Sequence, residues 1–593
     1  MTNTWISKHT LLLNWLQSRL SERQFFILSS ILVGLTAGLA AVLLKSLVHL
    51  IYELITRDYN LPFQLWLYLF LPFTGLLITV LYVQRFHKGT FDKGTSYILF
   101  AITRKSSLMA PFHMVAHLIT SAITIGFGGS SGLEAPIATT GSAIGSNYAR
   151  TYRLNYRQRT LLLSCGAAAG IAAAFNAPIA GVLFAIEILL LDISATAFIP
   201  LIIASAVGAL CSNIILQDGI LLSFKTQIPF NFYNTPFYIL LGIAAGLLAT
   251  YHSRTFLKVD TWFAQRKNPY LKVCIAGGIL AVLILLFPPL FGEGYTSVIA
   301  LSQNDTQSLL NASILKDFIT NEWLVLLFIG SIMLIKTFAV AATISSGGNG
   351  GNFAPSLMTG AFLGFLFSRF VNLSGFGKLP ESNFTLVAMA GVMSGVMHAP
   401  LTAIFLIAEV TGGYGLMIPL MIVASISYTV SRFIEPESIE SIKLAQRGAA
   451  IIHDRDKKIL SDLSLSKLTE TNFQPVVETA QLRDLIGIIE KTTRNIFPVI
   501  NEEGKLTGVI ELNAIREIMF NTELYDKIVV KELMRKPPAI IEEGESMDEV
   551  MKKFDSTDSW NLPVTRLGKY VGFISKSSIF NKYRSELIEK SVH

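Results

Sequence analysis

Long uncharged segments dominate the first 445 residues of this 593-residue chain. They lie at 24–44, 60–84, 160–186, 193–217, 226–253, 273–292, 337–368, 382–408 and 410–431. Each one reaches the roughly 20 residues that an α-helix needs to cross a lipid bilayer. Only 15% of all residues are charged and the mean hydropathy is +0.52, which is far more apolar than a typical soluble protein. The sequence therefore predicts a polytopic membrane protein with about ten or more hydrophobic helices.

The two ends of the chain differ from this membrane part. Residues 5–20 mix leucine and tryptophan with polar side chains, a pattern typical of an amphipathic helix lying along a membrane surface. We therefore assign 1–22 to an amphipathic N-terminal helix and 23–445 to a transmembrane domain. After residue 445 charges return and the apolar runs stop, so 446–593 is predicted to be a soluble domain.

Glu134 is a lone carboxylate inside an apolar part of the chain. Residues 106–133 before it and 135–149 after it carry no charge. A carboxylate is costly at membrane depth, so it marks a functional site by default. Glycines precede it in GGSSGLEAP and Pro136 follows it, which predicts a loop that leads into a helix N-terminus. The N–H groups and positive dipole end of such a helix attract anions, so Glu134 is expected to lie where an anion would bind.

The membrane part also repeats itself. GGSSGLEAPIATTGSAIG (128–145) aligns with GGNGGNFAPSLMTGAFLG (347–364) at a shift of 219. AAAGIAAAFNAPIAGVLFAIEI (167–188) aligns with AMAGVMSGVMHAPLTAIFLIAEV (388–410) at a shift of 222. Two motifs repeated in order predict a duplication into halves of about 23–217 and 226–433, in which broken helices place an anionic substrate near the midplane.

The repeat separates two kinds of acidic position. Glu187 and Glu409 match each other in the two halves, which favours a structural role for both. Glu134 has Phe353 as its counterpart, so it breaks the symmetry. The mechanism is therefore expected at Glu134.

Two similar modules fill the soluble tail. IFPVINEEGKLTGVIELNAI (496–515) has the pattern of strand, turn, strand and helix start, and LPVTRLGKYVGFISKSSI (562–579) repeats it. A helical pattern precedes each of them, at 479–491 and 546–555. The tail is therefore predicted to be a pair of α/β modules, at about 465–523 and 530–588.

With these residues the chain resembles the CLC family of chloride channels and anion/proton exchangers, and its tail resembles a CBS-domain pair. GLEAP (132–136) stands where the family has Gly-Lys/Arg-Glu-Gly-Pro, GGNFAP (350–355) where it has Gly-x-Phe-x-Pro, and FNAPIAGVLFAIE (175–187) is a third match. The resemblance implies an all-α polytopic membrane domain of two inverted repeats, followed by an α/β CBS-pair domain. It also implies a homodimer in the cell (plasma or inner) membrane with cytoplasmic CBS domains, and small inorganic anions, chloride first, as partners. No nucleic-acid partner is expected.

By this resemblance Glu134 is the gating residue, whose deprotonated side chain occupies the anion site until protonation or displacement releases it. The alternative is a carboxylate that permanently caps its own helix. Bound chloride ions are expected, with no required cofactor and no metal. The anion-binding residues implied beside Glu134 are Gly132, Leu133, Asn352, Phe353 and Ala354.

The family's first anion-binding motif, Gly-Ser-Gly-Ile-Pro, is altered in this chain. Its candidate is DKGTSYIL (92–99), in which Gly94 is retained, Lys93 stands where the central serine usually lies and Ser96 replaces the proline. A shift of register would leave Thr95 or Ser96 as the hydroxyl donor of the anion site. A lysine whose ammonium reaches the cytoplasmic interface is the alternative reading of Lys93.

The family's central tyrosine is also replaced. It is expected within PESIESIKLAQRG (436–448), which contains no tyrosine and offers Glu440 instead. Lys93, Ser96 and Glu440 are therefore predicted to form an inner gate. There, Lys93 and Glu440 are expected to pair with each other.

A proton-relay glutamate of many exchangers follows directly after the position of Glu187. Here that position is Ile188, which cannot carry a proton. We therefore favour a channel-like, uncoupled anion conductor, with an anion/proton exchanger as the alternative. A function of another class is a CBS-based metabolite sensor with little ion flux.

Nucleotide-binding CBS pairs carry an aspartate that holds the ribose hydroxyls. Ala514 and Ser578 stand at its two positions here, so we favour a regulatory or dimer-stabilising platform over an adenine-nucleotide site. No convincing nucleophile–base pair or metal-ligand set occurs in the sequence, and an enzyme is not predicted. His113, His117 and His398 are expected in core or interface positions.

Overall fold

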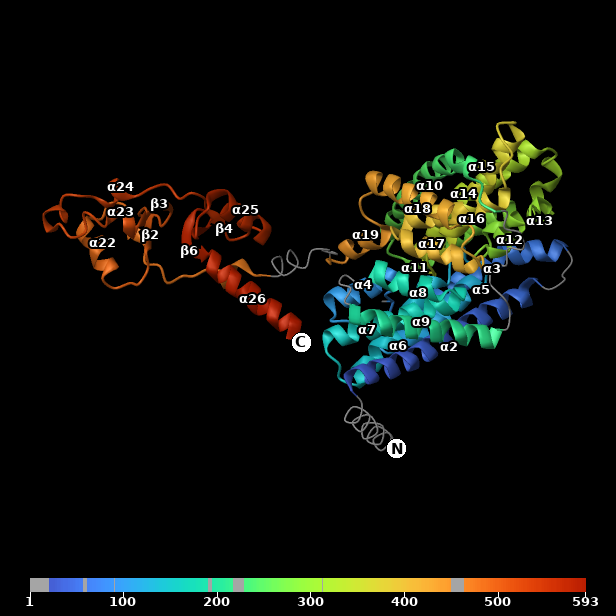
Figure 1. Ribbon diagram of the computed structural model, residues 1–593, viewed down its shortest axis with the longest axis horizontal. Helices are drawn as coiled ribbons and strands as arrows, with labels where there is room; N and C mark the ends of the chain where they lie inside the picture. Colours follow the sequence, from blue (N-terminus) through green and yellow to red (C-terminus); the bar gives the residue numbers. More distant parts are fainter. Residues whose placement is uncertain are drawn as a thin grey trace, which may run out of the picture. The chain divides into compact units, whose positions relative to one another are not determined.

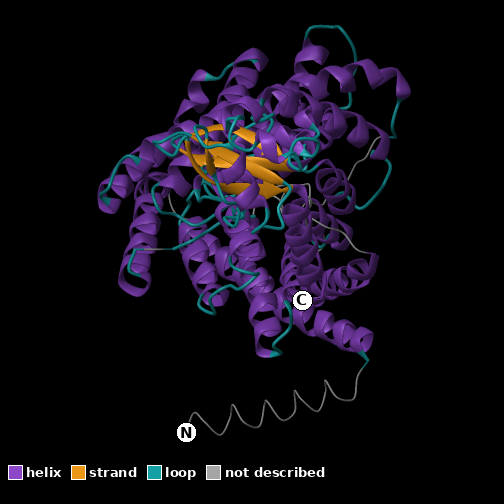
Figure 2. Cartoon of the chain, turned by 90° about the vertical axis from the view of Figure 1, so that its left-hand side faces the viewer, coloured by secondary structure: helices purple, strands orange, loops and turns teal. Residues whose placement is uncertain are grey.

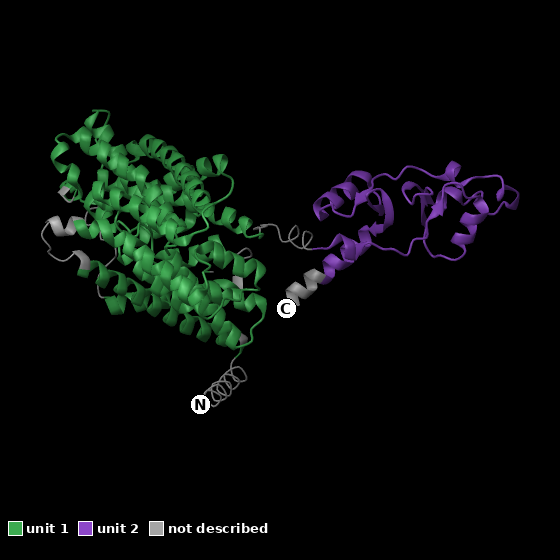
Figure 3. Ribbon diagram, turned by 180° about the vertical axis from the view of Figure 1, so that it is seen from behind, with its two compact units in different colours: residues 1–451 green, residues 452–593 purple. Residues whose placement is uncertain are grey.

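The computed structural model describes residues 21–56, 61–89, 91–189, 195–216, 229–311, 313–449 and 463–592. The amphipathic helix predicted at 1–22 lies outside the described residues except at its last two positions. The chain divides into two compact units, residues 1–451 and 452–593 (Figure 3). This division falls close to the boundary predicted after residue 445.

Helices build the described part of the first unit, in two groups that follow the two halves of the sequence (Figure 1). The first group is α2 (Glu22–Thr56), α3 (Leu61–His87), α4 (Thr95–Arg104), α5 (His113–Gly126), α6 (Glu134–Thr151), α7 (Tyr156–Phe175), α8 (Pro178–Phe184), the π-helix η1 (Ala185–Leu189) and α9 (Ala195–Leu216). The second group is η2 (Phe232–Asn234), α10 (Thr235–Ala264), α11 (Pro269–Leu286), η3 (Pro288–Leu290), α12 (Tyr295–Ser302), α13 (Thr306–Asn311), η4 (Ile314–Phe318), α14 (Glu322–Ser345), α15 (Phe353–Leu373), α16 (Glu381–Met397), α17 (Pro400–Val410), α18 (Met417–Ile434) and α19 (Ile439–Gln446).

The lengths of these helices suit a bilayer. Among the described residues, nine helices are long and apolar enough to cross a membrane. Three shorter apolar helices, at His113–Gly126, Pro178–Leu189 and Pro400–Val410, accompany them. The prediction of a polytopic helical membrane domain is therefore confirmed.

The two halves pack by the same contacts. In the first half α6 packs against α7, and in the second half α15 packs against α16. A Cβ atom on Gly145 would lie 2.0 Å from the carbonyl oxygen of Leu162, and one on Gly364 would lie 2.1 Å from that of Phe384. These four residues correspond pairwise in the repeat, so the same close helix approach requires glycine in both halves. The duplication read from the sequence is present in the fold.

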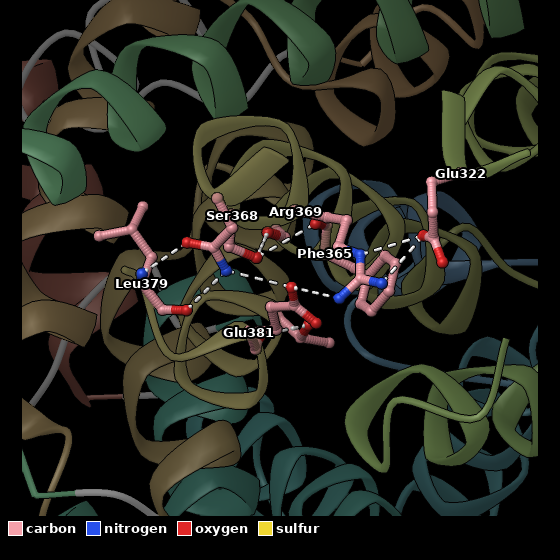
Figure 4. A network of polar contacts seen from close by, with 9 residues as sticks. Glu322, Phe365, Ser368, Arg369, Leu379 and Glu381 are labelled. Atoms are coloured by element: carbon pink, nitrogen blue, oxygen red, sulfur yellow. Dashed lines mark hydrogen bonds and ion pairs between the residues drawn. The ribbon is translucent and has the colours of Figure 1, made fainter. Parts of the chain in front are cut away.

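An ion-pair network holds the C-terminal part of α15. Arg369 binds Glu322 at 2.9 Å and Glu381 at 3.2 Å, which are the first residues of α14 and α16 (Figure 4). Ser368 Oγ donates to the carbonyl oxygen of Phe365 beside them. The network connects α15 to both neighbouring helices.

The second unit contains the strands (Figure 2). Each of its two sheets has three strands, the first pair parallel and the second antiparallel, in the orders β1-β2-β3 and β4-β5-β6. The elements are α21 (Leu465–Leu468), β1 (Val476–Val477), α22 (Leu482–Ile489), β2 (Ile496–Ile500), β3 (Leu506–Glu511), α23 (Leu512–Ile515), η5 (Thr522–Leu524), α24 (Val530–Leu533), β4 (Ile541–Glu542), α25 (Met547–Thr557), β5 (Asn561–Arg566), β6 (Lys569–Ser575) and α26 (Lys576–Val592). The predicted pair of α/β modules is confirmed.

Candidate functional site

The glycine loops of the two halves meet at equivalent residues. Gly132 and Gly351, which correspond at the shift of 219, exchange two backbone hydrogen bonds of 3.0 and 2.9 Å. A Cβ atom on Gly351 would lie 2.6 Å from the Cβ atom of Ala135, so a larger residue has no room there. This contact brings the N-termini of α6 and α15 to one place. The two broken helices expected from the sequence therefore meet.

Two further hydrogen bonds cross between the loops with the same symmetry. The Ser130 N–H donates to Thr343 Oγ1 and the Asn349 N–H donates to Thr124 Oγ1, each at 3.1 Å. Ser130 corresponds to Asn349 and Thr124 to Thr343 in the repeat. Backbone donors of each loop are thus satisfied by the other half, which holds both irregular segments inside the apolar core.

Glu134 lies between these helix ends. Its side chain is 3% exposed. Oε1 accepts a 2.6 Å hydrogen bond from the Tyr295 hydroxyl, and Oε2 accepts a 3.3 Å bond from the Ala354 N–H. Glu134 is the first residue of α6 but binds the N-terminus of α15, so its carboxylate caps the helix of the other half.

The other residues predicted for this site lie around that carboxylate. Leu133 and Asn352 are the residues just before α6 and α15, and Phe353 is the first residue of α15. The Phe353 ring packs against Phe175, with 5.4 Å between ring centroids. Its side chain therefore belongs to the core, and its contribution to the site is the helix end that it begins.

Sequence reasoning missed the turn that supplies Tyr295. The segment 292–295 (GEGY) reaches the start of α6, where Glu293 Oε1 accepts a 3.1 Å bond from the Leu133 N–H. Gly294 has φ +90°, and a Cβ atom there would lie 2.2 Å from Met358 Sδ, so the turn requires glycine.

A buried lysine anchors the same turn. Lys336 of α14 is 0% exposed and donates to the Gly292 carbonyl oxygen at 2.9 Å. Its signal was present in the sequence, since Lys336 is the only charge between Trp323 and Ser368. Glu293 had a similar signal, because it is the only charge between Lys272 and Asp305.

The inner pair predicted between Lys93 and Glu440 is wrong. Lys93 Nζ donates to the carbonyl oxygens of Ile344 and Gly348, at 3.2 and 2.7 Å. Glu440 Oε2 accepts a 2.7 Å bond from the Ser96 N–H, and no ion pair joins Glu440 to Lys93 in the part of the chain that the structure describes. The helix ends explain the difference. The ammonium binds the negative C-terminal end of α14, and the carboxylate binds the positive N-terminal end of α4.

The altered first motif forms the start of α4. Gly94 precedes the helix with φ +80°, a conformation that glycine adopts without strain. Thr95 is its first residue and lines the cavity beside Glu134. Ser96 contributes its backbone N–H, so the structure uses this residue through its main chain.

Two cavities meet at Glu440. The smaller one, of about 10 Å³, has room for about one water-sized sphere and is lined by Thr95, Glu134, Ala135, Phe184, Asn352, Phe353, Met397 and Glu440. The larger one, of about 350 Å³, is lined by Lys93, Lys272, Lys443 and Arg447 as well as by Asp260 and Glu440. We call the larger cavity the basic vestibule. Ala135, Asn352 and Glu440 line both cavities, so these three residues lie between the basic vestibule and Glu134.

Ile188, at the position of the exchangers' relay glutamate, and its neighbour Glu187 both lie in the π-helix η1. Ile188 lies in η1, half-buried. Glu187 before it accepts bonds from the N–H groups of Leu401 and Thr402, at 3.1 and 2.8 Å, and from the Thr402 hydroxyl at 2.7 Å. Its carboxylate is thus held at the start of α17.

His113 and His117 are buried in the core as expected, while His398 is half-buried beside Tyr428. His113 Nδ1 and His117 Nε2 lie 3.1 Å apart in the core, and His117 Nδ1 contacts Asn349 Nδ2 at 3.1 Å. Within the described ranges, no group of three or more His, Cys, Asp or Glu residues could hold a metal ion.

In the tail, polar side chains near Ser578, which stands at the ribose-aspartate position, bind each other. Ser575 Oγ donates to Glu470 Oε1 at 3.1 Å, and Glu470 Oε2 pairs with Arg494 at 2.7 Å. The Arg494 guanidinium also lies over the Phe473 ring, 4.3 Å from its centroid. The bond between Ser575 and Glu470 connects the two modules of the tail, and the Arg494 contacts hold Glu470 within the first module.

Comparison with known proteins agrees with this geometry. The family described as voltage gated chloride channel matches residues 75–432, and the CBS domain matches 465–521 and 530–585. The Voltage-gated ClC-type chloride channel ClcB of Escherichia coli is 32% identical over 322 residues, which are 51% of this chain and 72% of the relative. Among solved structures, a slow cyanobacterial Cl⁻/H⁺ antiporter superposes with a TM-score of 0.62 at 22% identity over 72% of this chain and 98% of its own. A CLC-type fluoride/proton antiporter superposes with a TM-score of 0.58 at 21% identity, over 71% and 98%. The chain belongs to the voltage-gated chloride channel family, and carries a C-terminal pair of CBS domains.

Proposed function

We propose that this protein moves chloride or a similar small anion across a membrane along a path gated by Glu134. The supporting observation is the place of its carboxylate, whose Oε2 accepts the Ala354 N–H at the N-terminus of α15. A permeating anion would use the same kind of donor at the same helix end. Protonation of Glu134, or its displacement by the anion, frees this donor and opens the path.

The charges of the basic vestibule also support transport of an anion. Its four basic residues outnumber its two acidic ones, which favours entry of anions over cations. Lys443 pairs with Asp260 at 3.4 Å and Arg447 with Asp92 at 3.1 Å, which leaves Lys93 and Lys272 against Glu440. The vestibule therefore concentrates anions at the inner approach to Glu440.

We further propose that conduction is channel-like and uncoupled from protons. Ile188 cannot relay a proton, and the carboxylate of Glu187 is occupied at α17. An anion/proton exchanger is the second candidate, favoured by the two antiporters that the fold resembles. A metabolite sensor with little ion flux is the candidate of another class.

The setting proposed for this activity is a homodimer in the cell membrane, with the CBS pair on the cytoplasmic side as a regulatory platform. The apolar helices of the first unit support the membrane. The polar groups of Ser575 and Glu470 already bind each other, which supports a platform over an adenine-nucleotide site.

Purified protein in liposomes tests the proposal. Chloride efflux and proton uptake are recorded together for the native chain and for Glu134→Gln. The proposal expects chloride efflux without proton uptake, and faster efflux from Glu134→Gln, because a neutral side chain competes less with the anion. Stoichiometric proton uptake would select the exchanger, and no flux for chloride, fluoride, bromide or nitrate would select the sensor.

A further inference from the structure

The basic vestibule is much larger than a chloride ion. Its volume of about 350 Å³ falls within the range of cavities that bind small molecules, roughly 300–1,000 Å³. The small cavity beside Glu134, by contrast, has about 10 Å³. The vestibule therefore has room for a solute of several heavy atoms, directly next to the narrow part of the path.

Two lysines that line the vestibule have no acidic partner. Among the described residues, neither Lys93 nor Lys272 forms an ion pair, whereas the other two basic residues of the vestibule do. Asp260 is not available to them. Its Oδ2 pairs with Lys443 at 3.4 Å, and its Oδ1 accepts a 2.5 Å hydrogen bond from Ser345 Oγ. Two positive groups are therefore left unpaired on the wall of the vestibule.

The Lys93 ammonium has a donor to spare. An ammonium carries three N–H groups, and two of those on Lys93 donate to the carbonyl oxygens of Ile344 and Gly348. The third has no acceptor in the part of the chain that the structure describes, and the side chain lines the vestibule. The C-terminal end of α14 thus holds the ammonium in place while one N–H group remains available to a ligand.

Lys272 lies in the first turn of α11, and Pro269, the first residue of that helix, also lines the vestibule. A cation is disfavoured there, because the N-terminal end of a helix is the positive end of its dipole. Within the described ranges, the Lys272 ammonium forms neither a hydrogen bond nor an ion pair that would offset this cost. An anion bound at Lys272 is attracted by the lysine and by the helix end together.

The charges of the vestibule also act on each other. Burial lowers the pKa of Lys93, the positive charges of Lys443 and Lys272 lower it further, and Asp260 raises it. Glu440, the other acid of the vestibule, is bound at the start of α4. One doubly charged anion in contact with Lys93 and Lys272 would neutralise both lysines and remove their repulsion.

A phosphate monoester has this chemistry. Its phosphoryl group carries a charge of about −1.5 to −2 at pH 7 and three strong acceptor oxygens. Lysine side chains and helix N-termini are common binding groups for phosphate. A halide is a single atom with a single charge, so one halide leaves part of the positive charge unbalanced.

We propose that the basic vestibule binds the phosphoryl group of a phosphate ester at Lys93 and Lys272, and that the bound ester closes the path to chloride. The binding site stands on the vestibule alone. The closure rests on the proposed function, because Ala135 and Asn352 line both cavities and so join the vestibule to the cavity at Glu134. A soluble ester and a lipid headgroup present the same phosphoryl group.

Isothermal titration of the purified full chain with methyl phosphate tests the site. Methyl sulfate is the matched control ligand, because it has a similar shape but only one negative charge, and it is expected to bind much more weakly. Lys272→Gln removes no bond within the described chain and is expected to bind methyl phosphate at least about tenfold more weakly than the native chain. Lys267→Gln changes an exposed lysine just before α11 and is expected to match the native chain.

Chloride efflux from liposomes tests the closure and distinguishes the two sources of the phosphoryl group. In phosphatidylcholine liposomes, methyl phosphate at about ten times its dissociation constant fills about nine sites in ten, so efflux is expected to fall about tenfold. Lys267→Gln is expected to show the same fall and Lys272→Gln a much smaller one. Liposomes with added phosphatidic acid and no methyl phosphate form the second arm. A fall in that arm alone that Lys272→Gln removes would assign the site to a lipid headgroup.

The remaining outcomes separate this inference from the proposed function. If the native chain carries chloride but neither methyl phosphate nor phosphatidic acid slows it, the inference fails alone. Equal binding of methyl phosphate to the native chain and to Lys272→Gln, or equal binding of methyl phosphate and methyl sulfate, also overturns it. If methyl phosphate binds in a way that depends on Lys272 but no chloride moves through the native chain, the proposed function fails and the binding site stands.

Discussion

Two pairs of equivalent positions in the halves of the membrane domain behave in opposite ways. At the first pair, both halves carry an acid, and each acid caps the other half. Glu187 binds the N–H groups of Leu401 and Thr402, while Glu409 binds those of Ile179 and Ala180 at 2.9 and 2.8 Å. The acceptors and the donors both correspond at the shift of 222. The two caps are therefore one structural device used twice.

At the second pair only one half carries an acid. Glu134 begins α6, and its counterpart Phe353 begins α15 with an aromatic ring packed in the core. The Glu134 carboxylate has no symmetric partner, lies against a cavity and is held by Tyr295 and Ala354. The first pair therefore stabilises the fold, and the second pair is the place where the two halves differ.

The largest effect expected from this contrast is on folding. Glu187→Ala and Glu409→Ala leave helix-start donors of the membrane domain without acceptors, at a cost of about 1–3 kcal/mol for each donor. We expect both variants to lower the melting temperature in detergent strongly, and the double variant to give little folded protein in size-exclusion chromatography. Glu134→Ala, as the matched change at the asymmetric site, frees one backbone donor where Glu187→Ala frees two, so it is expected to lower the melting temperature less. A similar fall in melting temperature for all three single variants would contradict the distinction between the structural acids Glu187 and Glu409 and the proposed gate Glu134.

A smaller effect is expected at Tyr295, whose hydroxyl binds the carboxylate of the proposed gate Glu134. Tyr295→Phe removes the 2.6 Å hydrogen bond to the Glu134 carboxylate, a kind of bond worth about 1.5–3 kcal/mol when the acceptor is charged. Glu134 should then leave its place more readily, and chloride efflux should rise about tenfold or more.

The double variant Glu134→Gln, Tyr295→Phe serves as the control for that change. Efflux equal to that of Glu134→Gln alone is expected, because the phenol acts through the carboxylate. A further rise in the double variant would show that Tyr295 acts on the anion independently of Glu134.

A still smaller effect is expected between Lys93 and Glu440, which bind different helix ends. The melting temperatures of Lys93→Met, Glu440→Gln and the double variant give their coupling free energy. We expect a coupling near the level of about 0.5 kcal/mol found for independent sites. A coupling above about 1 kcal/mol would restore the direct pair that the sequence predicted.

Most of the fold could be predicted from local patterns in the sequence. Uncharged runs identified the membrane helices, and the two repeated motifs identified equivalent residues such as Gly132 and Gly351, which the structure joins. The asymmetry at Glu134 pointed to a site whose backbone partner Ala354 was among the predicted residues. These features are readable because helix periodicity, glycine breaks and internal symmetry are properties of short segments.

The rest of the site depends on contacts between distant segments. Glu293 reaches Leu133 from 160 positions away, and nothing in the short GEGY turn says which helix it will meet. Lys93 and Glu440 were matched to each other because their charges are opposite. In the fold, the ends of α14 and α4 provide nearer partners of opposite sign. Helix ends act as partial charges, but their positions appear only once the chain is folded.

The smallest effect is expected for an acid that is neither buried nor symmetric. Asp526 in the tail pairs with Arg483 at 2.6 Å, with both side chains more than half exposed. The hydrogen bond from Arg483 lowers the pKa of Asp526, so the pair contributes above the ordinary pKa of aspartate and its contribution is lost as the pH falls through the lowered value. At pH 7 the pair is fully formed, but solvent and salt screen it. Asp526→Asn is therefore expected to leave the melting temperature of the full chain at pH 7 unchanged within error, at low and high salt alike. A fall as large as that of Glu187→Ala would mean that losing a hydrogen-bonded carboxylate is costly wherever it lies. The place of Glu187 and Glu409 at helix ends inside the membrane domain would then no longer explain why these paired acids matter.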